Sequence, residues 1–371
     1  MGPENRRRQG EARPRLRLRT AAALIAALVA TGAGAGAPSV VASAAAGAPH
    51  ARSVVAFIRQ MRDGAPVIWA LVAGGGAPRR LGPGADPLVS PDGMLVAAAT
   101  GLLASREVLL YPSTGGSPAG FELMQGAEAV PVAWSADSRY LAVEMLATSP
   151  AGARDAGLAV FDTSSQRTVV VARGQVSGVS FAAGPRDEVI FGLSRSSSAL
   201  GAVNLYESPP DAAAPVALTH DGRSFDPLWT VRGIVFDRER LRGLFRAPAY
   251  QLWLMSGGRA TRLTDMRIPP LLDGLIPLSA SADGNRLLAE YVGEDTSSAW
   301  TVALHPLRLR ALNVAGSPVQ GAAISRSGAA VLVDSGAFME PANRGTVESV
   351  PFGGRGPVRR LARGATPSWN L

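Results

Sequence analysis

The stretch Asp86-Pro87-Leu88-Val89-Ser90-Pro91-Asp92-Gly93, followed by an apolar run at 94–99, decides the fold. Variants of this unit recur along the chain, each with an apolar segment, a tight turn and a second apolar segment. Aligned on Ser90, the recurring position falls at Ser135, Ala182, Thr230, Ser281, Ser325 and Asn370, with gaps of 45, 47, 48, 51, 44 and 45 residues. A period of this length is typical of repeat folds in which each unit is one four-stranded sheet.

The turns and the outer strands follow the same period. Asp-Gly steps such as Asp92-Gly93 and Asp283-Gly284 predict tight hairpins, because glycine accepts positive φ, and we interpret these aspartates as turn residues. A second repeat, with Gly followed by Arg-Leu, lies at 75–81, 257–264 and 355–361 and predicts the outermost strand of each sheet. Trp134, Trp229 and Trp369 share one register of the innermost strand, where we expect them to pack between sheets.

The two ends of the repeat region complement one another. The first repeat lacks its innermost strand and begins with Val54-Val55-Ala56-Phe57-Ile58, whereas residues 366–371 are an innermost strand with nothing after it. We therefore expect the C-terminal strand to complete the first sheet, which removes exposed sheet edges. The prediction is an all-β chain with a single β-propeller at 53–371, of seven four-stranded blades, or of six if the weak fourth unit is misread.

On these residues the chain resembles the WD40-like repeat of the TolB-type β-propeller family, over essentially 53–371. The resemblance implies a periplasmic or extracellular propeller. Many members are binding scaffolds for proteins or peptides, and some are fused to peptidase or lyase chemistry. TolB itself carries an additional N-terminal α/β domain, which we do not expect here because Ala44 and Ser53 are too close to hold one.

The positive charge is concentrated at the N-terminus. The formal net charge is +8, but residues 1–44 hold seven arginines against Glu4 and Glu11, which leaves +3 for the remainder. The basic residues of the chain are all arginine, which together with the abundance of Ala, Gly and Pro reflects genome composition rather than phosphate recognition. We therefore expect no nucleic-acid binding.

The N-terminus has the order of an export signal. A basic stretch through Arg19 precedes an apolar run at 21–30 and a small-residue region in which Ala42-Ser43-Ala44 matches a cleavage site. We predict a signal peptide at 1–44 cleaved after Ala44, a short linker at 45–52, and a secreted or periplasmic (cell-envelope) product. An uncleaved membrane anchor is the alternative. The chain has no cysteine, which excludes disulfides and thiol chemistry.

The scarcity of catalytic residue types and motifs in the sequence favours a binding protein. The histidines are His50, His220 and His305, and neither a G-x-S-x-G nor an H-E-x-x-H motif is present. No cofactor or metal is predicted, although calcium in the channel is left open. The leading hypothesis is a monomeric, non-catalytic scaffold for a protein, peptide or other ligand. The alternative is a carboxylate- or metal-dependent hydrolase or lyase on a propeller.

The predicted partner-binding face is the one opposite the Asp-Gly turns, because its loops vary in length and variable loops concentrate function. The predicted contacts are Asp86, Arg223, Asp226, Leu271 and Leu272. In the competing interpretation, the two leucines pack on the sixth blade and the two aspartates cap turns before proline.

Overall fold

The computed structural model describes residues 53–61, 64–100, 107–123, 127–147, 156–182, 187–195, 202–240, 249–269, 272–293, 296–335 and 345–370. The predicted signal peptide at 1–44, the linker at 45–52 and Leu271 lie outside them. Their regular elements are all β-strands, which confirms the all-β prediction. No helix that could span a membrane occurs in the described part of the chain.

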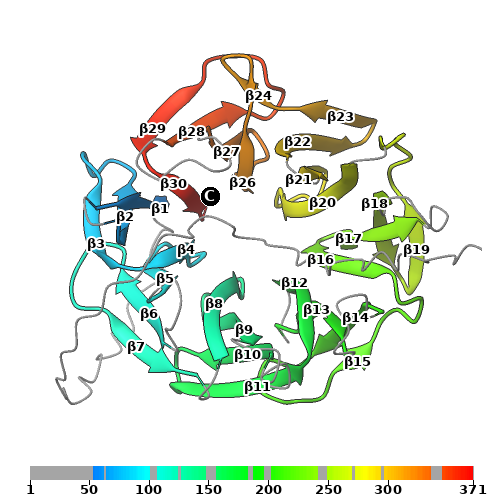
Figure 1. The fold of residues 1–371 in the computed structure, drawn as a ribbon, viewed down its shortest axis with the longest axis horizontal. Helices are drawn as coiled ribbons and strands as arrows, with labels where there is room; N and C mark the ends of the chain where they lie inside the picture. The colour runs from blue at the N-terminus through cyan, green and yellow to red at the C-terminus, as the bar shows by residue number, and fades with distance from the viewer. Residues whose placement is uncertain are drawn as a thin grey trace, which may run out of the picture.

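The strands form four-stranded antiparallel groups, which follow one another in chain order around a central axis, as the blades of a propeller do (Figure 1). The first group contains β1 (Val54–Gln60), β2 (Pro66–Val72) and β3 (Arg79–Pro83) together with β30 (Ala365–Trp369). The second contains β4 (Ala85–Val89), β5 (Leu95–Ala99), β6 (Glu107–Pro112) and β7 (Ala119–Glu122). The third contains β8 (Ala127–Trp134), β9 (Tyr140–Ala147), β10 (Gly157–Asp162) and β11 (Arg167–Arg173).

The fourth group contains β12 (Gln175–Phe181), β13 (Val189–Ser194), β14 (Asn204–Ser208) and β15 (Val216–Ala217). The fifth contains β16 (Ser224–Thr230), β17 (Gly233–Arg240), β18 (Ala249–Ser256) and β19 (Arg259–Arg262), and the sixth contains β20 (Leu272–Ala280), β21 (Arg286–Gly293), β22 (Ser297–Leu304) and β23 (Leu307–Ala311). The fifth and sixth groups are joined where Tyr250 of β18 pairs with Gly274 of β20 in parallel orientation. The last group contains β26 (Gln320–Ile324), β27 (Ala330–Asp334), β28 (Thr346–Pro351) and β29 (Arg359–Arg363), and a small hairpin, β24 (Asn313–Val314) with β25 (Ser317–Pro318), precedes it.

The predicted aspartate turns are confirmed between the first two strands of three groups. At β4–β5 the Ser90 hydroxyl donates to Asp92 Oδ1 over 2.6 Å, and the same carboxylate oxygen accepts the Met94 N–H over 2.9 Å. The next residue, Gly93, has φ 72°. Ser135 and Asp137 repeat this arrangement, as do Ser281 and Asp283. The Ser-x-Asp pattern thus folds each turn locally, because the side chains satisfy the backbone donors of the turn.

The core lies between neighbouring sheets. The described residues contain seven apolar clusters, and each joins two groups that are adjacent in Figure 1. Trp134 packs between the second and third groups and donates its indole N–H to the Leu88 carbonyl, as expected of an aromatic in this register. Val55 and Phe57 of β1 pack against Leu332 and Val347 of the last group. Apolar packing therefore also links the first sheet to the last.

Strand β30 belongs to the first sheet, and its residues are paired with those of β1. The register places Val55 opposite Trp369 and Ala56 opposite Ser368. The Asn370 side chain adds two contacts, since it accepts the Val54 N–H over 2.8 Å and donates to the Pro91 carbonyl over 3.3 Å. The C-terminal strand therefore contacts both the first and the second sheet.

Candidate functional site

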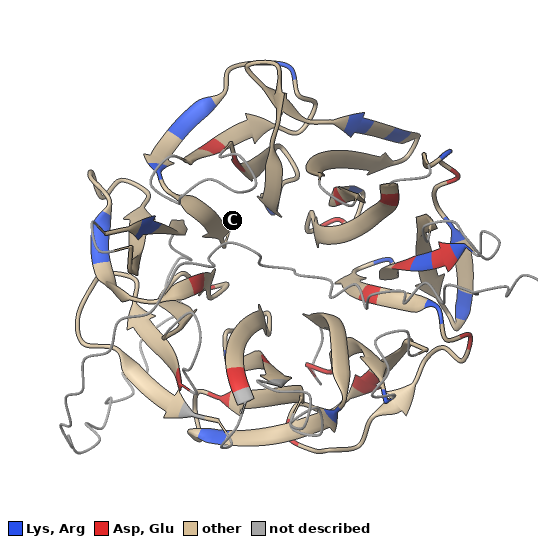
Figure 2. Ribbon diagram, in the orientation of Figure 1, with Lys and Arg blue, Asp and Glu red and all other residues tan. Residues whose placement is uncertain are grey.

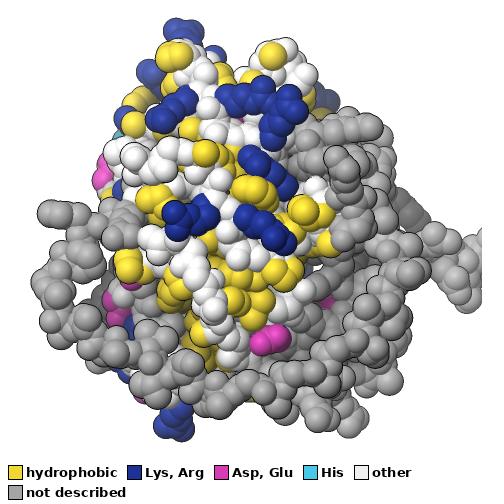
Figure 3. Space-filling view, turned by 90° about the vertical axis from the view of Figure 1, so that its left-hand side faces the viewer, with side chains coloured by type: hydrophobic (Ala, Val, Ile, Leu, Met, Phe, Trp, Pro, Cys, Tyr) yellow, Lys and Arg dark blue, Asp and Glu magenta, His cyan; other side chains and the backbone are white. Residues whose placement is uncertain are grey.

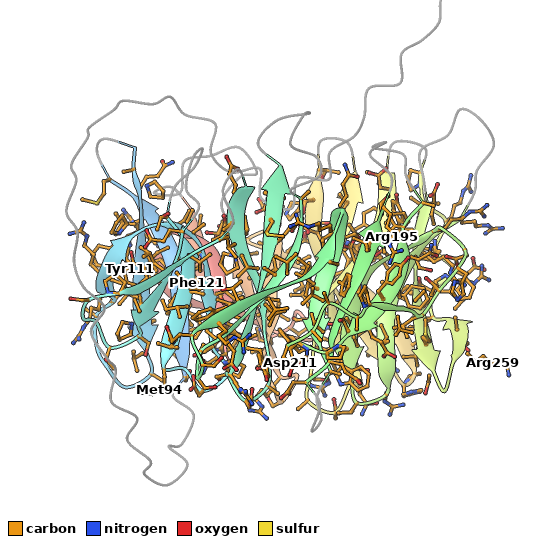
Figure 4. All side chains as sticks on the ribbon, turned by 90° about the horizontal axis from the view of Figure 1, so that it is seen from below. Met94, Tyr111, Phe121, Arg195, Asp211 and Arg259 are labelled. Carbon is orange, nitrogen blue, oxygen red and sulfur yellow. The ribbon has the colours of Figure 1, made fainter. Side chains whose placement is uncertain are left out.

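The two rims of the ring are built differently. Antiparallel order places the turns between the first and second and between the third and fourth strand of each sheet on the lower rim. In Figure 4, Met94, Asp211 and Arg259 lie along this rim, whereas Arg195, at the end of β13, lies nearer the other one. The upper rim therefore carries the connections between sheets and the starts of the innermost strands. The partner-binding face predicted from the sequence lies on this rim.

One cavity on the upper part of the fifth sheet gathers charged side chains. It has a volume of about 270 Å³, and its described lining is Arg223, Arg238, Glu239, Arg240, Gln251, Trp253 and Arg262. We call it the arginine pocket. It contains Arg223, one of the predicted contact residues, and Figure 2 shows basic residues gathered on this sheet. At about 30 Å³ per water, the cavity has room for about nine waters, or for one polar side chain.

Strand register brings these residues together. Arg238 and Arg240 are two apart on β17, so their side chains share one face of the sheet. Gln251 of β18 lies opposite Arg238, and Arg262 of β19 lies opposite Trp253. Since the residues that form the wall are spread over 40 positions of the chain from 223 to 262, only the folded sheet places them around one cavity.

Arg238 is held rigidly in the wall. Its Nε atom lies 2.7 Å from an Asp221 carboxylate oxygen. Its guanidinium carbon lies 4.5 Å from the centre of the Trp253 ring and 5.2 Å from that of Phe236. A guanidinium stacked on aromatic faces and paired with a carboxylate keeps its orientation.

The other arginines have less charge compensation. Arg262 Nη2 lies 3.0 Å from Asp265, and Arg240 Nη1 lies 3.8 Å from the other oxygen of the same carboxylate, so the two share one anion. Arg223 is exposed, and none of the acidic side chains in the described ranges lies within ion-pair distance of it. The pocket therefore offers guanidinium donors to an anion.

Gln251 forms the floor of the pocket. It is buried, with 4% of its surface exposed, and its side-chain oxygen accepts hydrogen bonds from the Thr264 hydroxyl and the Met266 N–H. Its amide nitrogen donates to the Met266 carbonyl over 2.9 Å. These bonds tie the connection between the fifth and sixth sheets to β18, so the pocket has a preformed base.

The two predicted aspartates occupy equivalent positions in innermost strands, four residues before Ser90 and Thr230. Asp86 has φ 49° and Asp226 has φ 43°, and each lies where the strand register shifts at a bulge. Asp226 is buried and accepts the Ser177 hydroxyl over 3.0 Å, which links the fifth sheet to the fourth. Burial raises the pKa of Asp86 to about 6. A carboxyl with that pKa is available in both protonation states near neutrality.

The structure brings some predicted residues together and separates others. Arg223 and Asp226 lie at the start of β16, and Leu272 begins β20 of the next sheet, where it packs against the core cluster between those sheets. Asp86 lies on β4, on the other side of the ring (Figure 1). Sequence reasoning missed Arg238, Arg240, Trp253 and Arg262. The alternation Asp237-Arg238-Glu239-Arg240 at a strand end is the signal that could have indicated two of them.

The described residues form no cluster suited to a metal ion. Within the ranges that the structure describes, no three His, Asp or Glu side chains gather closely enough to hold one. His220 and His305 are both exposed, and His305 Nε2 lies 2.9 Å from Arg232 Nη1.

Several solved β-propeller structures are similar to this chain. The β-propeller domain of the Trilobed protease from Pyrococcus furiosus matches with a TM-score of 0.59 at 11% identity, over 84% of this chain and 93% of that one. TolB from Acinetobacter baumannii matches with a TM-score of 0.50 at 15% identity, over 85% and 82%. The chain has the fold of a TolB-like β-propeller. An oligogalacturonate lyase in complex with manganese also matches this propeller, with a TM-score of 0.57 at 10% identity, over 83% and 91%.

No family model and no curated protein matches the sequence. At these identities the likeness concerns the fold alone. Since propellers of this shape include both a lyase and TolB, the chemistry of this propeller depends on its own residues and not on its fold.

Proposed function

We propose that this chain is an exported propeller of seven blades that acts as a non-catalytic binding scaffold. Its upper face binds a protein or peptide partner through an acidic group that enters the arginine pocket. The blade count is supported by the seven four-stranded groups, and closure of the ring is supported by the pairing of β30 with β1. The monomeric state and the location in the envelope or outside the cell are parts of the same proposal, the latter supported by the export pattern at 1–44.

The observation that carries the proposal is the preformed cationic cavity at the sheet that also holds Arg223 and Asp226. Arginine presents donors in a planar fork that matches a carboxylate in two-point contact. In the pocket, Arg238 is already oriented by Asp221 and Trp253, whereas the Arg223 guanidinium forms no ion pair with a described acidic side chain. A glutamate or aspartate side chain, or a C-terminal carboxylate, has the size and the charge that this cavity accepts.

We extend the proposal to the predicted hydrophobic contacts. Leu272 lies at the start of the neighbouring sheet, and Leu271 precedes it in the chain. We propose that apolar residues next to the acidic group of the partner contact this pair of leucines and that Asp226 supports the strand that presents Arg223. Asp86 belongs to the opposite side of the channel and contacts a partner only if the partner covers the channel mouth.

The test uses an array of peptides that contain single acidic residues, each beside its Glu→Gln or Asp→Asn counterpart. The purified chain should prefer the acidic member, and Arg223→Ser should weaken binding by about 10- to 100-fold, the value of a charge-assisted hydrogen bond of about 1.5–3 kcal/mol. Arg232→Ser is the matched control, because Arg232 is an exposed arginine on the opposite rim of the same sheet. Equal binding of acidic and neutral peptides would contradict the proposal.

One observation favours the second candidate function, a carboxylate-dependent hydrolase or lyase. Asp86 lies in an innermost strand with a pKa raised to about 6 by burial, which suits a general acid or base near neutral pH. Mass spectrometry of the array peptides after incubation distinguishes the two functions. Cleavage products that disappear with Asp86→Asn would establish the enzyme, whereas intact peptides that remain bound support the scaffold.

A further inference from the structure

The charges of the propeller are divided between two halves of the ring. Residues 85–223, which span the second, third and fourth sheets, contain 8 arginines and 14 acidic residues, for a net charge of −6. Residues 53–84 and 224–371, which form the other four groups, contain 21 arginines and 13 acidic residues, for a net charge of +8. The small overall charge of the propeller therefore conceals one acidic and one basic half.

The basic half carries its arginines on the outermost strands. All residues of β3, β19, β23 and β29 are described, and these four strands include Arg79, Arg80, Arg308, Arg310, Arg359 and Arg360 but no Asp or Glu. These six arginines are exposed. Figure 2 shows the four strands following one another around the outside of the ring, and Figure 3 shows many arginines and few acidic side chains on the described surface of the side that carries β3. We call the surface formed by β3, β19, β23 and β29 the arginine belt.

Apart from Arg262, which pairs with Asp265, the described contacts of the belt arginines are with neutral groups. Arg79 donates to the Thr114 carbonyl and Arg310 to the Gly353 carbonyl, each on the next sheet around the ring. Arg360 donates to the Thr346 hydroxyl over 3.2 Å. Within the described residues, the ion pairs formed on the belt involve Arg262 alone, so most of its charge is available to a ligand in solution.

Protection of sheet edges explains only part of this pattern. An outermost strand exposes unpaired backbone groups, and charged side chains prevent other strands from pairing there. Charges of either sign serve that purpose. On the other half, β7 carries Glu122 and β15 carries no charge, while β11 carries Arg167 and Arg173. One sign on four consecutive outer strands is more than edge protection requires, and it gives the basic half a continuous positive field.

The shape of the belt selects among anionic ligands. The outside of a ring is convex, so a flat membrane contacts only part of it, and duplex DNA, with a persistence length of about 150 bp, follows such a surface only at a cost in bending energy. Single-stranded nucleic acid needs aromatic side chains on which its bases stack, and the strands of the belt contain none. A flexible chain with one carboxylate per sugar can follow a convex row of guanidinium groups.

We propose that the arginine belt binds an acidic polysaccharide, whose carboxylates pair with guanidinium groups on successive blades. This surface differs from the site of the proposed function, and Arg262 of β19 is the one described pocket residue that also belongs to the belt. The propeller would then attach to a carboxylated glycan with its outer edge and keep its upper face open for a partner.

The test measures binding of the full chain to alginate, a polyuronate, by titration over a series of salt concentrations. Because each contact displaces counterions, log K should fall linearly with log salt. Arg80→Ser/Arg308→Ser/Arg359→Ser, on three strands of the belt, should lose at least 10-fold in affinity and show a shallower salt slope. Arg167→Ser/Arg232→Ser/Arg326→Ser removes three exposed arginines outside the belt, has the same net charge and should lose less than 3-fold.

Three outcomes would overturn the inference. In the first, the two triple variants lose affinity for alginate equally. In the second, neutral dextran binds as well as alginate. In the third, vesicles with anionic lipid or the single strand poly(dT) would bind more tightly than alginate at equal charge concentration. Arg223→Ser separates this inference from the proposed function, because it should leave alginate binding unchanged while it weakens binding of acidic peptides.

Discussion

Asp86 offers a test of how the channel environment acts on a carboxyl group. It lies at the bulge of β4 with φ 49°, and burial raises its pKa from 3.8 to about 6. The folded chain therefore holds a proton that the unfolded chain releases at lower pH. Between about pH 4 and pH 6, the folded state binds more protons than the unfolded state, so the contribution of Asp86 to stability decreases as pH rises through this window.

The magnitude follows from the size of the shift. A shift of about 2 units at about 1.4 kcal/mol per unit corresponds to a cost of up to about 3 kcal/mol once both states are ionised, and to no cost below about pH 4. Asp86→Asn removes the charge and keeps the shape, and asparagine tolerates the left-handed backbone that this position adopts. We expect the variant to be more stable than the wild type by up to about 3 kcal/mol at pH 8 and equally stable at pH 4.

The assay is urea denaturation followed by tryptophan fluorescence, at one-unit steps from pH 4 to pH 8. Asp211→Asn is the control, because Asp211 is an exposed aspartate on the lower rim and its substitution should change little at any pH. A stability difference between Asp86→Asn and the wild type that is the same at pH 4 and pH 8 would refute the reasoning. A variant less stable than the wild type at pH 8 would also refute it.

Three further predictions concern the fold. Deleting residues 366–371 removes most of β30 from the first sheet, and we expect cooperative unfolding at a lower temperature or aggregation, whereas an unchanged Tm would contradict closure. Ser135→Ala should cost about 1–3 kcal/mol in chemical denaturation, because the buried hydroxyl donates to Asp137 over 2.6 Å and accepts the Tyr140 N–H over 2.8 Å; no loss would mean that the turn folds without it. Gly178→Ala should lower Tm more than Gly257→Ala, since a Cβ at Gly178 would lie 2.5 Å from the Asp226 Cα, while at Gly257 nothing lies within 4 Å; equal shifts would show that backbone strain alone matters.

The repeat period predicted the innermost strands well because each unit folds by local chemistry. The aligned positions Ser90, Ser135 and Ser281 each follow directly after such a strand, and their aspartate partners form the predicted turns. The weak fourth copy around Val179 also forms a four-stranded group. In that group the hydrophobic pattern was sufficient to predict the strands, although the Ser-x-Asp turn is missing.

The candidate site was less predictable, because it depends on register between strands. Arg238, Trp253 and Arg262 surround one cavity only after β17, β18 and β19 are aligned, and no period along the sequence specifies that alignment. Asp226 was assigned correctly to the start of an innermost strand. Its left-handed backbone at a bulge and its hydrogen bond to Ser177 of the neighbouring sheet required the assembled ring. The nearly neutral net charge of the propeller also gave no sign that acidic and basic residues are separated between the two halves of the ring.

Pairing of Arg223 with an acidic group of the partner is the central claim, and a double-mutant cycle tests it most directly. The acidic peptide that binds best in the array and its neutral counterpart are each titrated against the wild type and Arg223→Ser, with Arg232→Ser as the control. If the two groups pair in the pocket, each single change should weaken binding, and the double change should cost no more than either single one, with a coupling energy of about 1.5–3 kcal/mol. Additive losses, with a coupling energy near zero, would show that Arg223 does not hold the acidic group.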